Sequence, residues 1–549
     1  MERHKWRYPV TESERGEIIG EVVRRVVDER VRAAEKSPEA AIEYVINDTL
    51  YFEKQRARNE GKTKEMQEEM KFLQSTTRRL TSATEEKKKK MLESIVGRCA
   101  EEIAGHFDPR VFAFSTRVLP LGLEAIFNAF SPTFFIRNFP NAPDLTSRIA
   151  IRGDIDHIRK VAERGTLIVV PSHSSNLDSV VVGWALHEAG LPPVNYGAGK
   201  NLFTNPLLSF FMNSLGAYKV DRKKKHALYK ETLKIYSLVL LECGYHSLFF
   251  PGGARSRSGM VERKLKLGLL GTGITAYINN LVNKKEPAEI YIVPMTINYP
   301  IVLEAETLID DYLKEVGKSR YIIEDDDSYK PFKAISFMTK LMGLESSMAL
   351  QFAPPLDPFG NRVDEEGKSL GPRGRVIDIR RYVTNAAGEI THDAARDAEY
   401  TRELGASIAD AFRRNIVALS THALAFVLFE MLRAANPGVD LYRLLRFEGR
   451  GARLVTKDVL SSLEKLVSRL LELERAGKIQ IGGAIRPGDC CREIMSEALR
   501  FFGMFHSRPA VVRKGDQLKL NDLNLLLYYH NRLVGWGLES LFNGGGKNG

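Results

Sequence analysis

A histidine and an aspartate five residues apart, His173 and Asp178, are the first residues of this chain whose types and spacing allow chemistry. His173 directly follows the apolar run TLIVVPS, and Asp178 falls on the expected first turns of the next helix. A carboxylate that reaches back to an imidazole fixes its tautomer and stabilises the cation formed when the ring takes a proton. The pair has the parts of an alcohol-activating base, although this spacing alone is more often structural.

The segment FFPGGARSRSG, residues 249–259, carries the second signal. An apolar strand leads into a loop with two glycines, two arginines and two serines. Backbone N–H groups, hydroxyls and guanidinium groups in such a loop can converge on a phosphate. A solvated basic turn is the alternative interpretation. A Walker loop is excluded, because Gly-x4-Gly-Lys-Ser/Thr is absent.

A third cluster spans residues 199–225, where a Leu/Phe/Met-rich middle is followed by the basic residues Arg222 and Lys223–Lys225. Core packing explains the apolar part adequately. Contact of Leu207–Phe211 with an acyl chain or a bilayer is the sharper alternative, with the basic residues facing anionic lipid. Lys200 before the apolar part and Arg222 after it are placed to bracket a phosphate site.

Short apolar runs alternate with helical segments after about residue 150, and they supply the elements that position these motifs. The runs TLIVVPSH, PVNYGAG, HSLFFPGG, IYIVPMTINY and ALQFAPPLDPFG have the composition of buried strands. Alternation of this kind predicts an α/β fold with a mostly parallel central sheet and flanking helices. The polar motifs follow strand ends, where such folds bind ligands.

Charge and periodicity outside this region predict further domains. The charged N-terminal segment has apolar residues at helical spacing, and three Leu-rich segments near the C-terminus are also helical in pattern. The predicted organisation is a helical region at 1–110, an α/β domain at 111–360, a connecting loop or insertion at 361–400, a helical domain at 401–543 and a flexible tail at 544–549.

Composition restricts the partners and the compartment. The 549 residues include 80 Lys and Arg against 69 Asp and Glu, and the net charge of +11 favours anionic partners. Four cysteines without Cys-x-x-Cys spacing indicate reduced thiols in a cytoplasmic setting. The charged N-terminus does not resemble a signal peptide. The uncharged stretches Asn201–Tyr218 and Ile416–Phe429 are unsuited to spanning a membrane, so peripheral association on its cytoplasmic side is expected.

Taken in order, these motifs resemble four blocks of the glycerol phosphate acyltransferase superfamily, and specifically its large glycerol-3-phosphate and dihydroxyacetone-phosphate branch. Tyr299, Glu304 and the stretch Leu525 to Leu533 continue the large-branch pattern. One departure stands out, because Gly252 occupies the place of a glutamate in the third block. The blocks are His173-Ser-Ser-Asn-Leu-Asp178, Gly199-Lys-Asn201-Leu202 with Gly216 to Arg222, Phe250 to Gly259, and Val293-Pro294.

The resemblance implies transfer of a fatty acyl group from acyl-CoA or acyl carrier protein to glycerol 3-phosphate, without a metal or redox cofactor. His173 would be the base and Asp178 its orienting partner. Dihydroxyacetone phosphate and lysophosphatidate are alternative acceptors, and a non-catalytic phospholipid-binding scaffold is the alternative of another class. A nucleic-acid binder suits the charge but lacks a reading motif. The implied substrate-binding residues are Lys200, Asn201, Arg222, Gly253, Arg255, Ser256, Arg257, Ser258 and Pro294.

Overall fold

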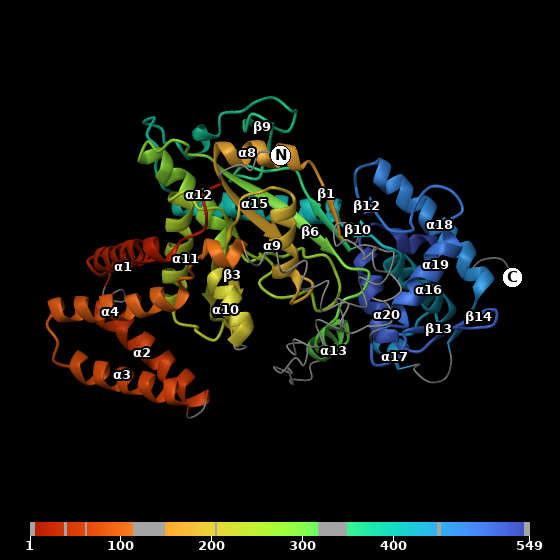
Figure 1. Cartoon of the computed structure of the whole chain (residues 1–549), viewed down its shortest axis with the longest axis horizontal. Coiled ribbons are helices and arrows are strands. Elements are labelled where there is room, and N and C mark those ends of the chain that lie inside the picture. The colour runs from red at the N-terminus through yellow and green to blue at the C-terminus, as the bar shows by residue number, and fades with distance from the viewer. Residues whose placement is uncertain are drawn as a thin grey trace.

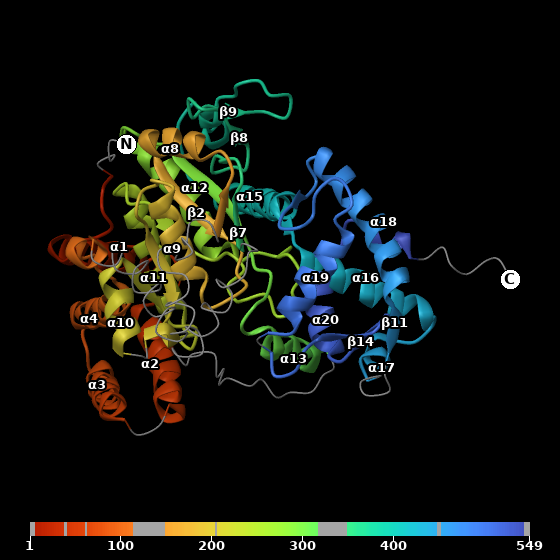
Figure 2. The same cartoon turned by 45° about the vertical axis from the view of Figure 1, so that its right-hand side comes forward.

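A seven-stranded sheet lies at the centre of the chain, with the N-terminal helices to one side of it and the C-terminal region to the other (Figure 1). The same division is visible in the rotated view of Figure 2. The structure is a computed structural model, and it describes residues 6–37, 41–60, 63–113, 149–203, 206–316, 348–446, 452–504 and 506–542.

The N-terminal region is helical, as the charge and periodicity predict. Thr63 and Thr84 cap two of its helices by accepting hydrogen bonds from backbone N–H groups of the first turn. Val22 and Val96 are fully buried on α1 and α4, the two helices that pack together and against α11 (Ala227–Glu242) of the core. The helices are α1 (Glu12–Ala34), α2 (Ile42–Asn59), α3 (Lys64–Leu80) and α4 (Glu85–Ile103).

The central sheet has the strand order β1-β7-β6-β2-β5-β3-β4. Neighbouring strands are parallel except β6 and β7, which are antiparallel, so β1 and β7 run against the other five. The strands are β1 (Ile149–Arg152), β2 (Thr166–Pro171), β3 (Asn195–Gly199), β4 (Ala217–Val220), β5 (Ser247–Leu248), β6 (Ile290–Asn298) and β7 (Met348–Phe352).

Helices cover both faces of this sheet, and β2 shows why its sequence is apolar throughout. All six of its residues are buried. Leu167 and Val169 face a core shared with α9 and the C-terminal region, whereas Ile168 and Val170 face a core shared with α11 and α12. The elements between the strands are α8 (Ile155–Arg164), α9 (Asp178–Glu188), η2 (Lys200–Phe203), α10 (Pro206–Ser214), α11 (Ala227–Glu242), α12 (Leu267–Val282) and α13 (Ala305–Val316).

The segment after β7 forms a hairpin and turns before a long helix, α15 (Ala394–Asn415). This helix crosses the predicted boundary between residues 400 and 401, and it packs against α12 and β6. It therefore belongs spatially with the central sheet. The short elements before it are β8 (Arg362–Val363), β9 (Ser369–Leu370) and η4 (Ile379–Val383).

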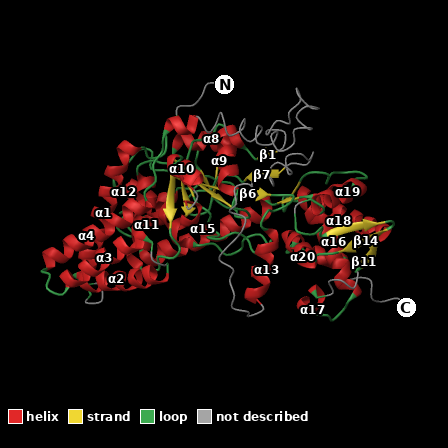
Figure 3. Cartoon of the chain, turned by 60° about the horizontal axis from the view of Figure 1, so that its bottom comes forward, coloured by secondary structure: helices red, strands yellow, loops and turns green. Residues whose placement is uncertain are grey.

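The C-terminal region is built around α16 (Ser420–Ala435), which α18, α19 and α20 surround. The uncharged stretch Ile416–Phe429 is buried here as core. Figure 3 shows that this region also contains strands, which the sequence did not predict. The remaining elements are β10 (Val417–Ala418), α17 (Leu441–Leu445), β11 (Arg453–Val455), α18 (Thr456–Arg475), β12 (Gln480–Ile481), α19 (Cys491–Phe502), β13 (Val511–Lys514), β14 (Gln517–Leu520), α20 (Leu523–His530), η5 (Asn531–Leu533) and η6 (Leu538–Leu541).

The predicted α/β fold with a mostly parallel sheet is confirmed, as are the five strands expected from the apolar runs. The short outer strands β1 and β4 were not predicted. None of the described helices is both long enough and apolar enough to cross a bilayer. The predicted flexible tail at 544–549 lies outside the described residues.

Candidate active site

His173 lies in the loop that follows β2, and Asp178 is the first residue of α9. Nδ1 of the imidazole is 2.8 Å from Oδ2 of the carboxylate. The imidazole therefore carries its proton on Nδ1, and Nε2 is the nitrogen left to accept another proton. The side chain of His173 is 14% exposed, whereas that of Asp178 is fully buried.

The carboxylate of Asp178 is held by three further hydrogen bonds. The backbone N–H groups of Ser174 and Ser175 donate to Oδ2 at 2.7 and 2.9 Å. The hydroxyl of Tyr299, just beyond β6, donates to Oδ1 at 2.7 Å. Burial and the negative charge of Asp178 raise the pKa of Tyr299 well above its usual value, so its phenol remains a donor. Asp178 is thus a buried, fully hydrogen-bonded anion.

Glu304 fixes the remainder of the loop between His173 and Asp178. Its carboxylate accepts hydrogen bonds from the hydroxyl of Ser175 and the backbone N–H of Asn176, both at 2.9 Å. Arg255 pairs with the same carboxylate at 3.4 Å. Burial raises the pKa of Glu304, and the charge of Arg255 opposes that rise. One arginine of the predicted phosphate loop is therefore brought to the His173 loop.

The loop after β5 covers His173 from a second direction. The ring of Phe250 stacks on the imidazole with centroids 4.2 Å apart. The backbone N–H of Ser256 donates to the carbonyl of His173 at 2.8 Å. The backbone N–H of His173 donates to Oε1 of Glu262, also at 2.8 Å. The structure thus brings the first and third sequence blocks together around one imidazole.

The other residues of this loop are arranged as follows. Gly253 has a φ of +72° in a tight turn, and its N–H donates to the carbonyl of Phe250. The hydroxyl of Ser256 donates to the carbonyl of Met260, and the hydroxyl of Ser258 accepts from the backbone N–H of Met260. Arg257 pairs with Glu315 at 2.7 Å near the surface. The N–H of Gly253 is therefore engaged within the loop.

Lys200 and Arg222 were predicted to bracket the phosphate, but the structure does not bring them to His173. They follow β3 and β4, which are two and three strands away from β2, roughly 10 and 14 Å across the sheet. Nζ of Lys200 lies 3.0 Å from Glu102 and 3.3 Å from Asp221. Its charge is thus neutralised by carboxylates of the protein.

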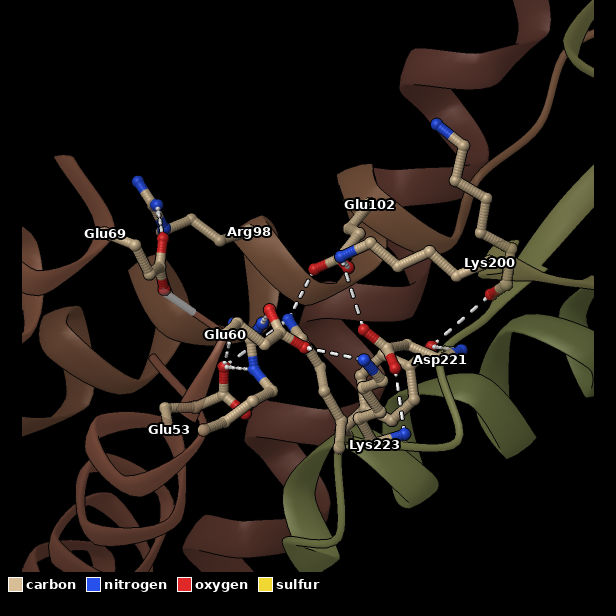
Figure 4. Close-up of polar contacts among 12 residues, drawn as sticks. Glu53, Glu60, Glu69, Arg98, Glu102, Lys200, Asp221 and Lys223 are labelled. Carbon is tan, nitrogen blue, oxygen red and sulfur yellow. Dashed lines mark hydrogen bonds and ion pairs between the residues drawn. The ribbon is translucent and has the colours of Figure 1, made fainter. Parts of the chain in front are cut away.

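Lys200 belongs to a wider ion cluster that joins α2 and α4 to the ends of β3 and β4 (Figure 4). Lys224 is buried in this cluster, where it pairs with Glu53 and Glu102. The cluster holds the N-terminal helices onto the sheet. Its members are Glu53, Arg56, Glu60, Glu102, Lys200, Asp221, Lys223, Lys224 and His226.

Two predicted substrate-binding residues do not contribute a described side chain to the site. The side chain of Asn201 lies outside the described residues, as do those of Leu207, Leu208 and Phe211. Pro294 is buried within β6, opposite Val170 of β2, and its carbonyl accepts a hydrogen bond from Ala353.

The C-terminal helix α20 and the turn after it contribute residues that sequence reasoning did not assign. Asn531 donates from Nδ2 to the carbonyl of Ser258 at 2.9 Å. Arg532 is buried, donates to the carbonyl of Ile297, and interacts electrostatically with Glu262 and Asp178. The Leu525–Leu533 stretch gave the only sequence signal for them. A cavity of about 10 Å³ lies between the site and α20, lined by Ser174, Gly259, Tyr299, Val302, His422, Tyr528, Tyr529 and Arg532.

Within the described ranges, no group of three or more His, Cys, Asp or Glu side chains is arranged to hold a metal ion. The chemistry that this arrangement supports is proton transfer at Nε2 of His173, backed by the Asp178 anion. Arg255 pairs with Glu304 beside the His173 loop, and Arg532 interacts electrostatically with Asp178.

Comparisons with known proteins find similar chains. The glycerol-3-phosphate acyltransferase of Pseudomonas fluorescens is 25% identical over 342 residues, which cover 59% of this chain and 38% of that protein. The glycerol-3-phosphate acyltransferase of Pseudomonas aeruginosa is 26% identical over 249 residues, covering 42% of this chain and 28% of its own. The chain thus spans well under half the length of these relatives.

Among solved structures, the 1-acyl-sn-glycerophosphate acyltransferase of Thermotoga maritima is 15% identical, with a TM-score of 0.23, and covers 46% of this chain and 90% of that chain. The family model described as Acyltransferase matches residues 153–298, which include His173, Asp178 and the loop with Arg255 and Arg257. Residues 153–298 of the chain are therefore similar to the acyltransferase family.

Proposed function

We propose that this chain transfers a fatty acyl group from a thioester to the hydroxyl of glycerol 3-phosphate, with His173 as general base. The observation that carries the proposal is the His173–Asp178 pair, held at 2.8 Å within the acyltransferase domain. The Pseudomonas relatives are glycerol-3-phosphate acyltransferases, which supports glycerol 3-phosphate as the acceptor. Acyl-CoA and acyl carrier protein are the two candidate donors.

The reaction needs one group that takes and returns a proton. Nε2 of His173 would remove the proton of the acceptor hydroxyl as its oxygen attacks the thioester carbonyl carbon. The tetrahedral intermediate then collapses, the carbon–sulfur bond breaks, and the departing thiolate takes the proton back from Nε2. Asp178 would stabilise the imidazolium between these two steps. No covalent acyl-enzyme is required.

The acceptor phosphate would bind at the loop after β5. Arg255 and Arg257 offer guanidinium groups that suit a phosphate, with Ser256 and Ser258 beside them. Arg255 is the stronger candidate, because its partner Glu304 also contacts the His173 loop. Lys200 is excluded from the proposal, because Glu102 and Asp221 occupy its ammonium group.

The test is thiol release by the purified chain. Acyl-CoA and acyl carrier protein thioesters are offered with glycerol 3-phosphate, dihydroxyacetone phosphate or lysophosphatidate. We expect the highest kcat/KM with glycerol 3-phosphate, and a loss of at least about 100-fold in His173→Ala. His392→Ala is the matched control, because His392 is a surface histidine that contacts Asn279.

Two outcomes would replace this proposal. Turnover in His173→Ala equal to that of the wild type would remove the base assignment. If no acceptor gave thiol release while the protein bound phospholipid, the chain would be a non-catalytic scaffold. A preference for lysophosphatidate would keep the reaction and change the substrate.

A further inference from the structure

Glu262 lies against a glycine whose missing side chain leaves it room. A Cβ built on Gly252 would stand 3.0 Å from Oε1 of Glu262 and 3.3 Å from its Cγ. A contact of 3.0 Å is tighter than most real Cβ contacts, so a side chain at 252 would require the Glu262 carboxylate to shift by a few tenths of an ångström. The third block lacks a carboxylate at position 252. The carboxylate of Glu262, ten residues further along the chain, lies in the space that a side chain at 252 would enter.

This carboxylate holds the main chain of the proposed base. Oε1 accepts the backbone N–H of His173 at 2.8 Å, while Ser256 donates to the carbonyl of the same residue. Both polar groups of the His173 backbone are therefore fixed by one loop. The imidazole itself is fixed by Asp178 and by the stacked ring of Phe250.

A purely structural tie to one N–H group needs only one acceptor oxygen. Oε2 of Glu262 is buried and has no hydrogen-bond partner among the described residues. Burial raises the pKa of Glu262, while the N–H of His173 and the charge of Arg532 act in the opposite direction. The second oxygen is thus retained without a hydrogen-bond partner at a cost in stability, and attraction between Glu262 and His173 favours the ionised carboxylate, which together indicate a role in the site.

We propose that Glu262 is a positioning residue for His173, which holds its main chain through Oε1 and stabilises the transient imidazolium through its negative charge. The inference rests on the proposed function. Glu262 acts through His173 and does not contact the reacting atoms. Its charge reinforces that of Asp178, which meets the imidazole on the Nδ1 side.

Four variants distinguish the negative charge of Glu262, its hydrogen bond with the His173 N–H and the space beside Gly252. Glu262→Gln keeps an acceptor and removes the charge, so kcat should fall about tenfold while the acceptor KM stays unchanged. Glu262→Ala removes both, and kcat should fall about 100-fold. Gly252→Glu places a second carboxylate against the first and should also lose activity. Gly252→Glu combined with Glu262→Ala returns one carboxylate to this space and should recover at least about tenfold over Glu262→Ala.

Thermal unfolding is measured for all four variants, since a merely structural Glu262 would lower kcat and Tm together. Wild-type kcat in Glu262→Gln, or no recovery in the double variant, would overturn the proposal. Hydrogen exchange at the His173 amide needs no turnover and should accelerate in Glu262→Ala but not in Glu262→Gln. An unchanged exchange rate in Glu262→Ala would also overturn it, whereas absence of wild-type thiol release would count against the proposed function.

Discussion

Tyr299 donates a hydrogen bond of 2.7 Å to Oδ1 of Asp178, the carboxylate oxygen that His173 does not use. The phenol comes from the end of β6, and the carboxylate from the start of α9. The relationship orients the carboxylate plane, because each of its oxygens has a fixed donor. The orientation of His173 consequently depends on a residue from the neighbouring strand.

Tyr299→Phe should lower kcat about tenfold with little effect on the acceptor KM, since a hydrogen bond to a charged group contributes about 1.5–3 kcal/mol. Steady-state kinetics with varied acceptor measure both constants. Tyr291→Phe is the matched control, because Tyr291 is on β6, the strand that leads to Tyr299, and donates instead to the carbonyl of Gly367. Equal kinetics for the two variants would contradict an orienting role.

Asp178→Asn should cost both activity and stability, unlike His173→Ala. Asp178 is fully buried and accepts hydrogen bonds from four donors. The NH₂ group of an asparagine would therefore face at least one donor with which it cannot form a hydrogen bond. Leaving a buried donor unpaired costs about 1–3 kcal/mol. We expect Tm to fall in Asp178→Asn and to stay near the wild-type value in His173→Ala, as differential scanning fluorimetry would show. A wild-type Tm in Asp178→Asn would argue that the loop adapts.

We propose that membrane association is peripheral and electrostatic in part, with Lys223 and Lys225 as exposed contributors and Phe210, which is 55% exposed, as an apolar one. Lys224 was expected to act with them, but it is buried against Glu53 and Glu102 and cannot face lipid. Charge reversal of Lys223 and Lys225 to Glu should weaken sedimentation with anionic liposomes. A higher salt concentration should weaken liposome binding in the same way. Liposome binding that does not change with ionic strength would indicate a hydrophobic anchor.

The sequence predicted those parts of the fold and site that depend on local pattern. The run Thr166–Pro171 reads as a buried strand because both its faces are covered, and the His173–Asp178 spacing predicts their contact because a short turn joins them. The blocks around His173 and Arg255 were correctly expected to meet, since parallel strands end at the same edge.

What the sequence could not predict depends on long-range partners. Lys200 looks like a phosphate ligand from its neighbours, but Glu102, 98 residues away along the chain, pairs with it. Glu262 sits in a charged loop with no motif, and only the fold shows it beside Gly252. The stretch Leu525 to Leu533 matches the large-branch pattern but does not itself predict that Arg532 reaches the site, because C-terminal packing brings α20 and the turn after it there. These contacts follow from the tertiary structure alone.

The ion cluster predicts how acid affects the N-terminal helices. Burial by itself would raise the pKa of Glu53, but the interaction with His226, the hydrogen bonds from Arg56 and the charge of Lys224 outweigh it and lower the pKa to about 2. The usual value is 4.5, so the ionised carboxylate stabilises the fold above pH 4.5, and this stabilisation is lost as pH falls from 4.5 toward 2. The loss corresponds to roughly 3 kcal/mol.

Hydrogen exchange of α2 and α4 should therefore accelerate between pH 4.5 and 2, after correction for the intrinsic rate. Glu53→Gln should show the faster exchange already at pH 7, because Lys224 and Arg56 lose a buried partner. Glu69→Gln is a suitable control, since Glu69 pairs with the half-exposed Arg98. Equal protection of these helices in Glu53→Gln and Glu69→Gln would contradict the role of the cluster.

Arg255→Ala and Arg257→Ala should have different effects on kinetics and stability, although both residues belong to the proposed phosphate loop. Arg257 is 35% exposed and pairs with the surface residue Glu315, so Arg257→Ala removes a phosphate contact and little else. Its acceptor KM should rise about tenfold or more, which corresponds to the 1.5–3 kcal/mol of a charge-assisted contact. The KM for the acyl donor and Tm should be unchanged.

Arg255→Ala should have a wider effect, because Arg255 is 17% exposed and its partner Glu304 is buried beside the His173 loop. Removing the cation leaves the Glu304 carboxylate without that compensation, so kcat and Tm should fall along with acceptor affinity. Glu304→Gln introduced into Arg255→Ala removes the uncompensated charge. It should restore Tm and part of kcat without restoring acceptor KM. If it restored KM as well, Arg255 would support the loop and bind no phosphate, and Arg257 would be left as the only phosphate ligand proposed from this loop.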